Sequence, residues 1–113
     1  MRAPIKVGWT LGTAVLSALL FVTSIVWAQG DPAQVAKGEK VYLEKKCTVC
    51  HAIRGQGGKV GPELTMVGAK RDAEWLRMFM KGPKAMVPKA KMLPFKGSEE
   101  ELEAMVAYMA SLK

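Results

Sequence analysis

The sequence predicts an all-α protein in which one small helical domain follows an apolar N-terminal segment. Apolar residues recur with helical spacing in the C-terminal part of the chain, and no stretch alternates apolar and polar residues over the length of a strand. The stretch from Val7 to Ala28 carries no charged residue. The 113 residues suffice for one domain at most, and 50% apolar with 24% charged residues excludes a disordered or collagen-like chain.

The apolar segment Val7 to Ala28 has two interpretations. A helix of this length reaches about 33 Å, enough to cross a hydrocarbon core of about 30 Å. Trp9 and Trp27 stand near its ends as interfacial aromatics do, and Arg2 and Lys6 precede it, which keeps the N-terminus in the cytoplasm. A basic start, an apolar middle and a small-residue ending equally describe a signal peptide cleaved after Ala28.

We expect a retained anchor, with residues 1–28 as the transmembrane segment and residues 29–113 as a domain on the periplasmic side. Cleavage after Ala28 would leave the same domain soluble in the periplasm. Removing Arg2 and Lys6 from the 17 basic residues leaves 15 against 10 acidic ones, so the domain is basic. A domain this small buries little more than about 60% of its unfolded surface. We therefore expect a group other than its own side chains to fill part of its core.

The first helix is expected from about Pro32 to Lys45. Asp31 is a suitable N-cap, and a proline is tolerated at the first helical position. Val35, Tyr42 and Leu43 are its apolar side chains.

The second helix is expected from about Ala73 to Lys81, with Asp72 as its N-cap and Gly82-Pro83 as a stop signal. The third is expected from Glu99 to Leu112, where Ser98 and Glu101 form a capping box. Four apolar residues then follow at i, i+3, i+4 and i+7, namely Leu102, Met105, Val106 and Met109.

Two long segments without periodicity separate these helices, Ala52 to Arg71 and Gly82 to Gly97. Both are rich in Gly, Pro and Lys. Loops of this length need a reason, and a bound prosthetic group would explain both the loops and the small core.

The residues that carry chemistry are Cys47-Thr48-Val49-Cys50-His51, which form the C-x-x-C-H motif of haem attachment. Two thiols one turn apart can add to the two vinyl groups at one edge of a haem. The histidine beside the second thiol is then held under the iron as its ligand. We therefore expect one covalently attached haem c on Cys47 and Cys50, with His51 as an iron ligand.

Two other interpretations of the cysteine pair are weaker. A thioredoxin-like dithiol stands at a strand-to-helix turn of a βαβ unit, and no strand is expected here. A structural zinc ion requires four protein ligands, whereas Cys47, Cys50 and His51 supply three. A dithiol oxidoreductase that uses Cys47 and Cys50 stays open as an alternative.

From about Asp31 to Lys113 the sequence resembles the class I c-type cytochromes. The C-x-x-C-H motif anchors the resemblance, and further features agree with it: Gly38 with Tyr42, Gly61-Pro62-x-Leu64, Met92-Leu93-Pro94-Phe95 and Tyr108. The resemblance implies three main helices and long loops around one haem c. It also implies that the first and last helices cross near Gly38 and Tyr108.

The sixth iron ligand is expected to be a methionine. His51 is the only histidine, so a second histidine ligand within the chain is excluded, and a thioether is the soft neutral alternative. Met86 and Met92 both stand in a loop and in Met-x-Pro. Because the ligand of the family comes shortly before the last helix, the resemblance favours Met92. The family more often has proline directly after the ligand, so Met86 stays an alternative.

The resemblance implies roles for three more residues. The carbonyl of Pro62 accepts a hydrogen bond from the ring N–H of His51 and so fixes its tautomer. Leu64 packs on the haem face. Trp75 is either an ordinary core residue or donates its indole N–H to a haem propionate.

The segments expected to border the haem are basic. Three acidic residues between positions 45 and 96 stand against twelve basic ones: Lys45, Lys46, Arg54, Lys59, Lys70, Arg71, Arg77, Lys81, Lys84, Lys89, Lys91 and Lys96. Such a rim would steer a redox partner with an acidic surface, although a merely solubilising surface looks similar. No nucleic-acid recognition motif is present.

The sequence therefore predicts an electron carrier between membrane respiratory or photosynthetic complexes. With His51 and Met92 both on the iron, no coordination position is open to a substrate, so we do not expect an enzyme. Two alternatives stay open besides the dithiol. One is a fixed haem c subunit of a larger membrane oxidoreductase complex, and the other is a peroxidase-like or gas-binding protein if Met92 does not ligate.

Overall fold

The computed structural model describes residues 2–4 and 30–113. The expected anchor or signal helix, residues 7–28, lies outside the described residues. Within residues 2–4 and 30–113, no helix is long and apolar enough to cross a membrane.

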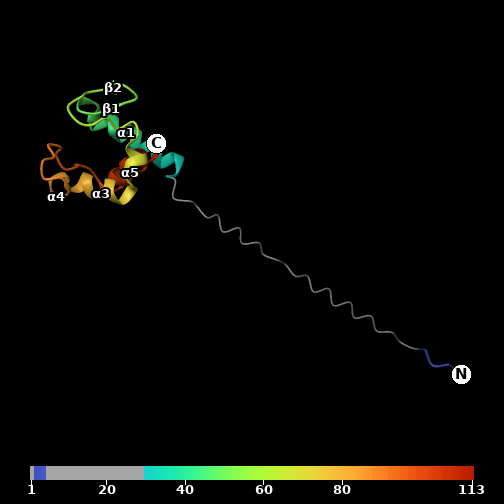
Figure 1. Cartoon of the computed structure of the whole chain (residues 1–113). Coiled ribbons are helices and arrows are strands. Elements are labelled where there is room, and N and C mark those ends of the chain that lie inside the picture. Colours follow the sequence, from blue (N-terminus) through green and yellow to red (C-terminus); the bar gives the residue numbers. More distant parts are fainter. Residues whose placement is uncertain (1, 5–29) are drawn as a thin grey trace.

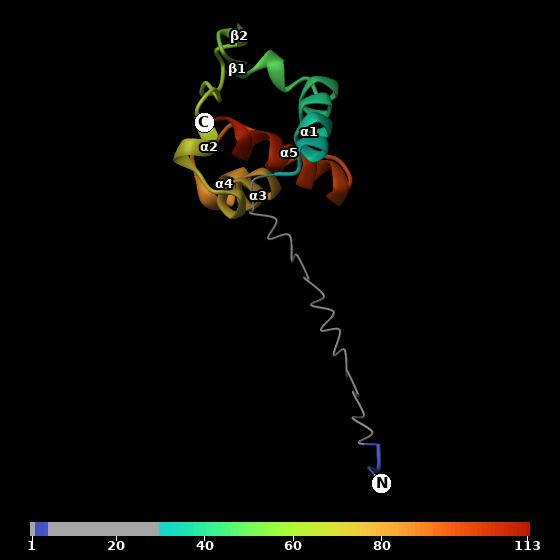
Figure 2. The same cartoon turned by 90° about the vertical axis from the view of Figure 1, so that its right-hand side faces the viewer.

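Three main helices form the domain, and their bounds lie within one residue of those predicted. They are α1 (Pro32–Glu44), α3 (Ala73–Lys81) and α5 (Glu99–Ser111). In both views α5 lies in the middle of the domain, with α3 and α4 on one side and the β1–β2 hairpin on the other (Figure 1, Figure 2).

Each main helix begins at the side-chain cap that its sequence indicates. The Asp31 carboxylate accepts the backbone N–H of Ala33, and the Asp72 carboxylate accepts that of Trp75. At the start of α5, Ser98 and Glu101 exchange both hydrogen bonds of a capping box. These local contacts explain why the helix starts are readable from sequence.

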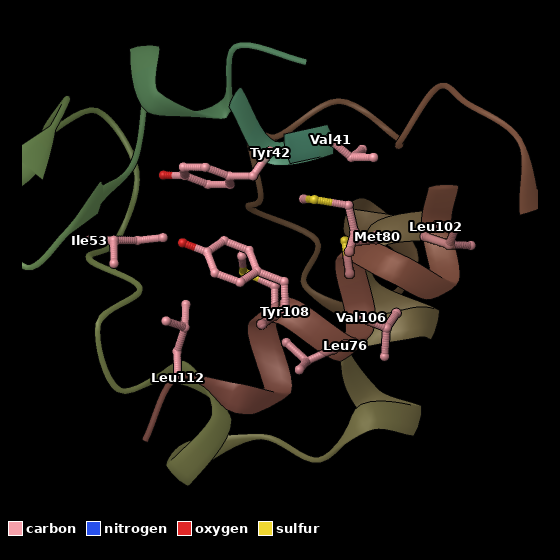
Figure 3. Close-up of a cluster of buried hydrophobic side chains, with 11 residues drawn as sticks. Val41, Tyr42, Ile53, Leu76, Met80, Leu102, Val106, Tyr108 and Leu112 are labelled. Carbon is pink, nitrogen blue, oxygen red and sulfur yellow. The ribbon is translucent and has the colours of Figure 1, made fainter. Parts of the chain in front are cut away.

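The first and last helices cross at Gly38. A Cβ at this position would collide with the carbonyl oxygen of Ala104 and would lie 2.6 Å from the Cβ of Tyr108, so only glycine permits the approach. Tyr42 and Tyr108 meet edge to face beside the crossing, with ring centroids 5.8 Å apart (Figure 3). The crossing near Gly38 and Tyr108 is as expected.

The core lies along the inner faces of α1, α3 and α5. Its buried side chains are Val41, Tyr42, Ile53, Leu76, Met80, Leu102, Met105, Val106, Tyr108, Met109 and Leu112, most of which are labelled in Figure 3. The four apolar residues predicted for the last helix are all among them. Leu43, in contrast, is 58% exposed, and Val41 takes the inner position on α1.

The two segments expected to be structureless contain short elements. These are α2 (Val67–Lys70), α4 (Pro83–Met86), the strands β1 (Ala52–Ile53) and β2 (Gln56–Gly57), and just before them the 3-10 turn η1 (Cys47–Val49). Gly82 ends α3 as expected, but Pro83 then begins α4 at its first position instead of starting a loop.

The hairpin corrects the expectation of a chain without strands. Its antiparallel pairs are Ala52 with Gly57 and Ile53 with Gln56. The two-residue turn consists of Arg54 and Gly55, with φ of 50° and 79°, as a type I′ turn requires. Strands of two residues are too short to show alternation, so periodicity could not reveal them.

Candidate functional site

The two cysteines and His51 share one tight turn directly after α1. Lys46 has φ 57°, which ends the helical run and starts η1. The backbone N–H groups of Cys50 and His51 both donate to the carbonyl of Cys47, at 3.2 and 2.9 Å. Both thiols are free and half-buried. They therefore stand one turn apart on one short segment.

The imidazole of His51 is oriented by Pro62. Its Nδ1 lies 2.7 Å from the Pro62 carbonyl oxygen. Because a carbonyl oxygen only accepts, Nδ1 carries the proton and Nε2 carries the lone pair that binds a metal ion. The structure thus contains the contact that the resemblance implies for Pro62.

Glycine brings the chain against this ring. A Cβ at Gly61 would lie 2.6 Å from Cε1 of His51 and 2.9 Å from its Nδ1. The backbone N–H of Gly61 donates to the carbonyl oxygen of Cys50 at 2.7 Å. The backbone N–H of Gly58 donates to the carbonyl oxygen of Thr48 at 2.8 Å. A Cβ at Gly58 would collide with the carbonyl of Val49. The glycines after the motif are therefore part of the site, and only their clustering in the sequence hints at this.

Tyr42 also contacts the motif, which the sequence did not indicate. Its hydroxyl donates to the carbonyl oxygen of His51 at 3.2 Å. Burial, followed by the nearby Cys47 and Tyr108, raises the pKa of Tyr42 to about 12. The hydroxyl is therefore protonated at physiological pH and stays a donor to the backbone carbonyl of His51.

Leu64 and Trp75 both pack partly buried against the core. Trp75 stacks on Phe79 at 4.9 Å between ring centroids, and the guanidinium of Arg71 lies 4.2 Å from the Trp75 ring. These contacts fit the interpretation of Trp75 as a packing residue. Its role toward a propionate stays a prediction, as does the contact of Leu64 with the haem.

The two candidate methionines have different surroundings. Met92 is half-buried, packs against the core cluster, and lines an open cavity of about 210 Å³ together with Leu93 and residues 82–85. Three residues later, the backbone N–H of Phe95 donates to the carbonyl oxygen of Met80 at 2.8 Å, which fixes the loop to α3. Met86 is the last residue of α4.

The acidic residues of α5 form ion pairs with basic side chains of α1, of its C-cap and of α3. Arg77 binds Glu103 through two hydrogen bonds of 2.5 and 2.8 Å. The other pairs are Glu99 with Lys81, Glu100 with Lys37 and Glu101 with Lys45. The Arg77 guanidinium lowers the pKa of the Glu103 carboxyl, and Glu103 raises the pKa of Arg77.

These ion pairs reduce the number of unpaired basic residues among the twelve predicted to border the haem. Lys45, Arg77 and Lys81 are engaged with α5. Within residues 30–113, nine of the twelve predicted rim residues make no ion pair: Lys46, Arg54, Lys59, Lys70, Arg71, Lys84, Lys89, Lys91 and Lys96. Most of them flank the C-x-x-C-H motif or the loop that carries Met92.

Comparison with known proteins agrees with this site. The profile of the family described as cytochrome c matches residues 35–113. The chain belongs to the cytochrome c family. The cofactor of this cytochrome c is covalently bound haem c, and a single haem is consistent with the size of the domain.

Three relatives span this cytochrome c to different extents. Cytochrome c2 of Rhodospirillum rubrum is 33% identical and covers 91% of this chain and 96% of its own. The cytochrome c subunit of menaquinol:cytochrome c reductase of Bacillus subtilis is 31% identical over 96% of this chain and 46% of its own. Cytochrome c oxidase subunit 2 of Alkalihalophilus pseudofirmus is 30% identical over 77% of this chain and 30% of its own. The chain thus spans less than half the length of two of these relatives.

A solved structure has the same fold. The c-type cytochrome SorU from Sinorhizobium meliloti matches with a TM-score of 0.57 and 25% identity, over 73% of this chain and 93% of its own.

The donor set fits haem c. Cys47 and Cys50 offer two thiols one turn apart, and the hydrogen bond to Pro62 leaves Nε2 of His51 as the metal-binding nitrogen. Gly61 leaves room for the imidazole ring against the backbone.

Proposed function

We propose that this cytochrome c carries single electrons between membrane respiratory or photosynthetic complexes, through one haem c with His51 and Met92 as axial ligands. When bound, the haem supplies a one-electron Fe(III)/Fe(II) couple. The observation that carries the proposal is the hydrogen bond of 2.7 Å between His51 and Pro62, next to the two thiols.

The chain's own residues attach the cofactor and tune it. Cys47 and Cys50 hold the macrocycle through thioethers, and Pro62 makes the His51 nitrogen a stronger donor to iron. Apolar side chains on the flanking loops, such as Val60 and Leu93, are exposed and available to exclude water at the haem edge. An apolar, water-poor site favours the less charged reduced state.

Met92 is proposed as the sixth ligand because it packs on the core beside a cavity and its loop is fixed at Phe95. Met86 is the weaker candidate, because it is the last residue of the short helix α4 and does not belong to the loop before α5. With His51 and Met92 bound, no position is open to a substrate, which is the reason to propose a carrier rather than an enzyme. A peroxidase-like or gas-binding protein would need this position free.

For the location, we propose that residues 7–28 form a retained membrane anchor and that the domain from residue 29 onward lies in the periplasm. The support is the absence of charge in this segment, the flanking Trp9 and Trp27, and the preceding Arg2 and Lys6. Cleavage after Ala28 is the alternative and gives a soluble periplasmic protein.

For the partner, we propose a redox protein with an acidic docking surface. Lys84 of α4 and the loop residues Lys89, Lys91 and Lys96 flank Met92 in the sequence, and all four are exposed. Charges of one sign around an exposed redox edge accelerate encounter with a partner of opposite charge and orient it.

A fixed subunit of a larger membrane oxidoreductase complex is the second candidate. Two relatives carry names of such subunits, one of a menaquinol:cytochrome c reductase and one of a cytochrome c oxidase. Gly8 and Gly12 have a spacing that permits close packing of the proposed anchor against a partner helix. Copurification of a stoichiometric partner with the full chain in mild detergent would favour this candidate over a free carrier.

The dithiol oxidoreductase is disfavoured by the environment of Cys47. Burial raises the pKa of the Cys47 thiol. Reactive cysteines of such enzymes have lowered pKa values, which keep the nucleophilic thiolate populated.

The proposal is tested by visible spectra of membrane and soluble fractions from cells that attach haem c. We expect a sharp α-band on reduction and a weak far-red charge-transfer band in the oxidised form, both in the membrane fraction. The same bands in the soluble fraction would mean cleavage after Ala28. A chain without covalent haem would contradict the proposal and favour the dithiol.

A further inference from the structure

The imidazole and the backbone of His51 are held by two different segments. The ring bonds to the carbonyl of Pro62 through Nδ1. The backbone lies against the β1–β2 hairpin: a Cβ at Gly57 would collide with the carbonyl oxygen of His51, and the next residue, Ala52, pairs with Gly57. The orientation of the ring relative to its own backbone therefore depends on how the chain around Pro62 lies beside the hairpin.

Pro62 depends on its neighbours to hold its carbonyl in place, because a proline has no backbone N–H to donate. Before it, the N–H of Gly61 donates to the carbonyl oxygen of Cys50 at 2.7 Å. After it, the N–H of Leu64 donates to the carbonyl oxygen of Ala52 at 2.8 Å. Both of these contacts are made by the backbone, so they are insensitive to the identity of the side chains.

Thr65 adds a contact that a side chain makes. Its Oγ1 accepts the backbone N–H of Arg54, the first turn residue of the hairpin, at 2.8 Å. The same hydroxyl donates its one proton to Oε1 of Glu63 at 2.6 Å, which leaves its lone pairs for Arg54. Arg54 has φ 50°, which residues other than glycine rarely adopt, so the bond stabilises an uncommon turn. The hydroxyl of Thr65 thus ties the chain after Pro62 to the hairpin.

We propose that Thr65 is a positioning residue for the imidazole of His51. By bonding to Arg54, its hydroxyl keeps the carbonyl of Pro62 in line with Nδ1 of His51. A carbonyl that accepts the Nδ1 proton makes Nε2 a stronger donor to iron, which stabilises the oxidised form. The inference rests on the proposed function, because it requires His51 as an iron ligand. Loss of the Thr65 hydroxyl loosens the Pro62 carbonyl and so raises the reduction potential.

Three variants separate this role from a general loss of stability. Thr65→Val removes the hydroxyl and nearly keeps the shape of the side chain, whereas Thr65→Ser keeps the hydroxyl. Ser111→Ala is the matched control, because it removes a hydroxyl that bonds to the backbone carbonyl of Tyr108 at 2.6 Å, at the C-terminal end of α5. The holoproteins are compared by redox titration of the haem absorbance and by denaturant unfolding followed by circular dichroism.

We expect Thr65→Val to shift the Fe(III)/Fe(II) equilibrium about 2- to 5-fold toward Fe(II), as weakening of one hydrogen bond implies. A tenfold change is about 59 mV for a one-electron couple, so the reduction potential should rise by about 20–40 mV. Thr65→Ser should keep the wild-type potential. Ser111→Ala should lose stability as Thr65→Val does, without a shift in potential. The amide proton of Arg54 should exchange with solvent slowly in the wild type and faster in Thr65→Val.

The inference is overturned if Thr65→Ser or Ser111→Ala shifts the potential as far as Thr65→Val does. Rapid exchange of the Arg54 amide in the wild type also overturns it, because the hydroxyl then does not hold the turn. A wild-type chain without a reversible one-electron haem couple overturns the proposed function, and this inference with it. A wild-type couple together with an unchanged potential in Thr65→Val overturns only the role of Thr65.

Discussion

Nδ1 of His51 lies 2.7 Å from the carbonyl oxygen of Pro62, and this single contact decides the chemistry available to the imidazole. It assigns the proton to Nδ1 and the lone pair to Nε2. Gly61 makes the contact possible, since any Cβ there would press on the ring. The polypeptide therefore orients the His51 imidazole through its own backbone.

Gly38→Ala tests the crossing of α1 and α5. Alanine raises helix propensity by about 1 kcal/mol, yet we expect a net loss of about 1–3 kcal/mol in unfolding free energy, because the new Cβ collides with Ala104. Ala36→Gly, on the exposed side of the same helix, is the control and should cost about 1 kcal/mol. Denaturant titration followed by circular dichroism measures both. A stabilised Gly38→Ala would show that the helices do not approach this closely.

Tyr42→Phe removes the hydroxyl that donates to the carbonyl of His51. The ring and its packing stay, so the expected loss is that of one hydrogen bond, about 1 kcal/mol of unfolding free energy. Tyr108→Phe is the matched control, since Tyr108 meets Tyr42 edge to face but its hydroxyl is not part of this bond. Equal losses in the two variants would argue against a specific role of the Tyr42 hydroxyl.

Acid should weaken the contact between α3 and α5. Arg77 lowers the pKa of the Glu103 carboxyl in the folded chain. The stabilisation is therefore present above the unfolded pKa of about 4.3 and is lost as the pH falls through the folded value. Because the pair is partly exposed, its size should be about 1 kcal/mol or less.

The measurement compares the unfolding free energy at pH 7 and pH 3 in the wild type and in Glu103→Gln. The variant should lose less stability on acidification. Glu39→Gln, on the exposed side of α1, should keep the wild-type dependence. A Glu103→Gln curve parallel to the wild type would mean that this pair does not contribute to the acid sensitivity.

The sequence predicts the three main helices well, because caps and periodicity are local properties. Asp31, Asp72 and Ser98 each bond to backbone N–H groups two or three residues away. The hairpin β1–β2 and the single-turn helices α2 and α4 are too short for any period to appear. Of the two turn residues with positive φ, Arg54 and Gly55, only the glycine is a type that commonly adopts it, so the sequence marks this turn weakly.

The candidate site likewise has a part that the sequence predicts and a part that it does not. The C-x-x-C-H motif is contiguous and is therefore visible in the sequence, and the resemblance to cytochromes pointed to Pro62. The bond from Tyr42 to His51 and the ion pairs of α5 join residues from different elements. Their charges were visible, but which cation meets which carboxylate depends on how the helices cross.

Removing the attachment should expose how much the fold depends on its cofactor. Cys47→Ser with Cys50→Ser eliminates both thioether bonds, so no haem should remain with the chain after extraction by acidified organic solvent. The half-buried side chains of Leu64 and Met92 would then lack the haem that we propose they contact, and thermal unfolding should become broader and begin at lower temperature. A sharp, wild-type transition in this variant would show that the core is complete without haem.

The ligation of iron by His51 and Met92 is tested most directly by the far-red absorbance of the oxidised holoprotein in the wild type, Met92→Ala and Met86→Ala. We expect the band in the wild type and in Met86→Ala, and its loss in Met92→Ala, which should also bind carbon monoxide when reduced. A band that survives in Met92→Ala and disappears in Met86→Ala would contradict the assignment and place Met86 on the iron.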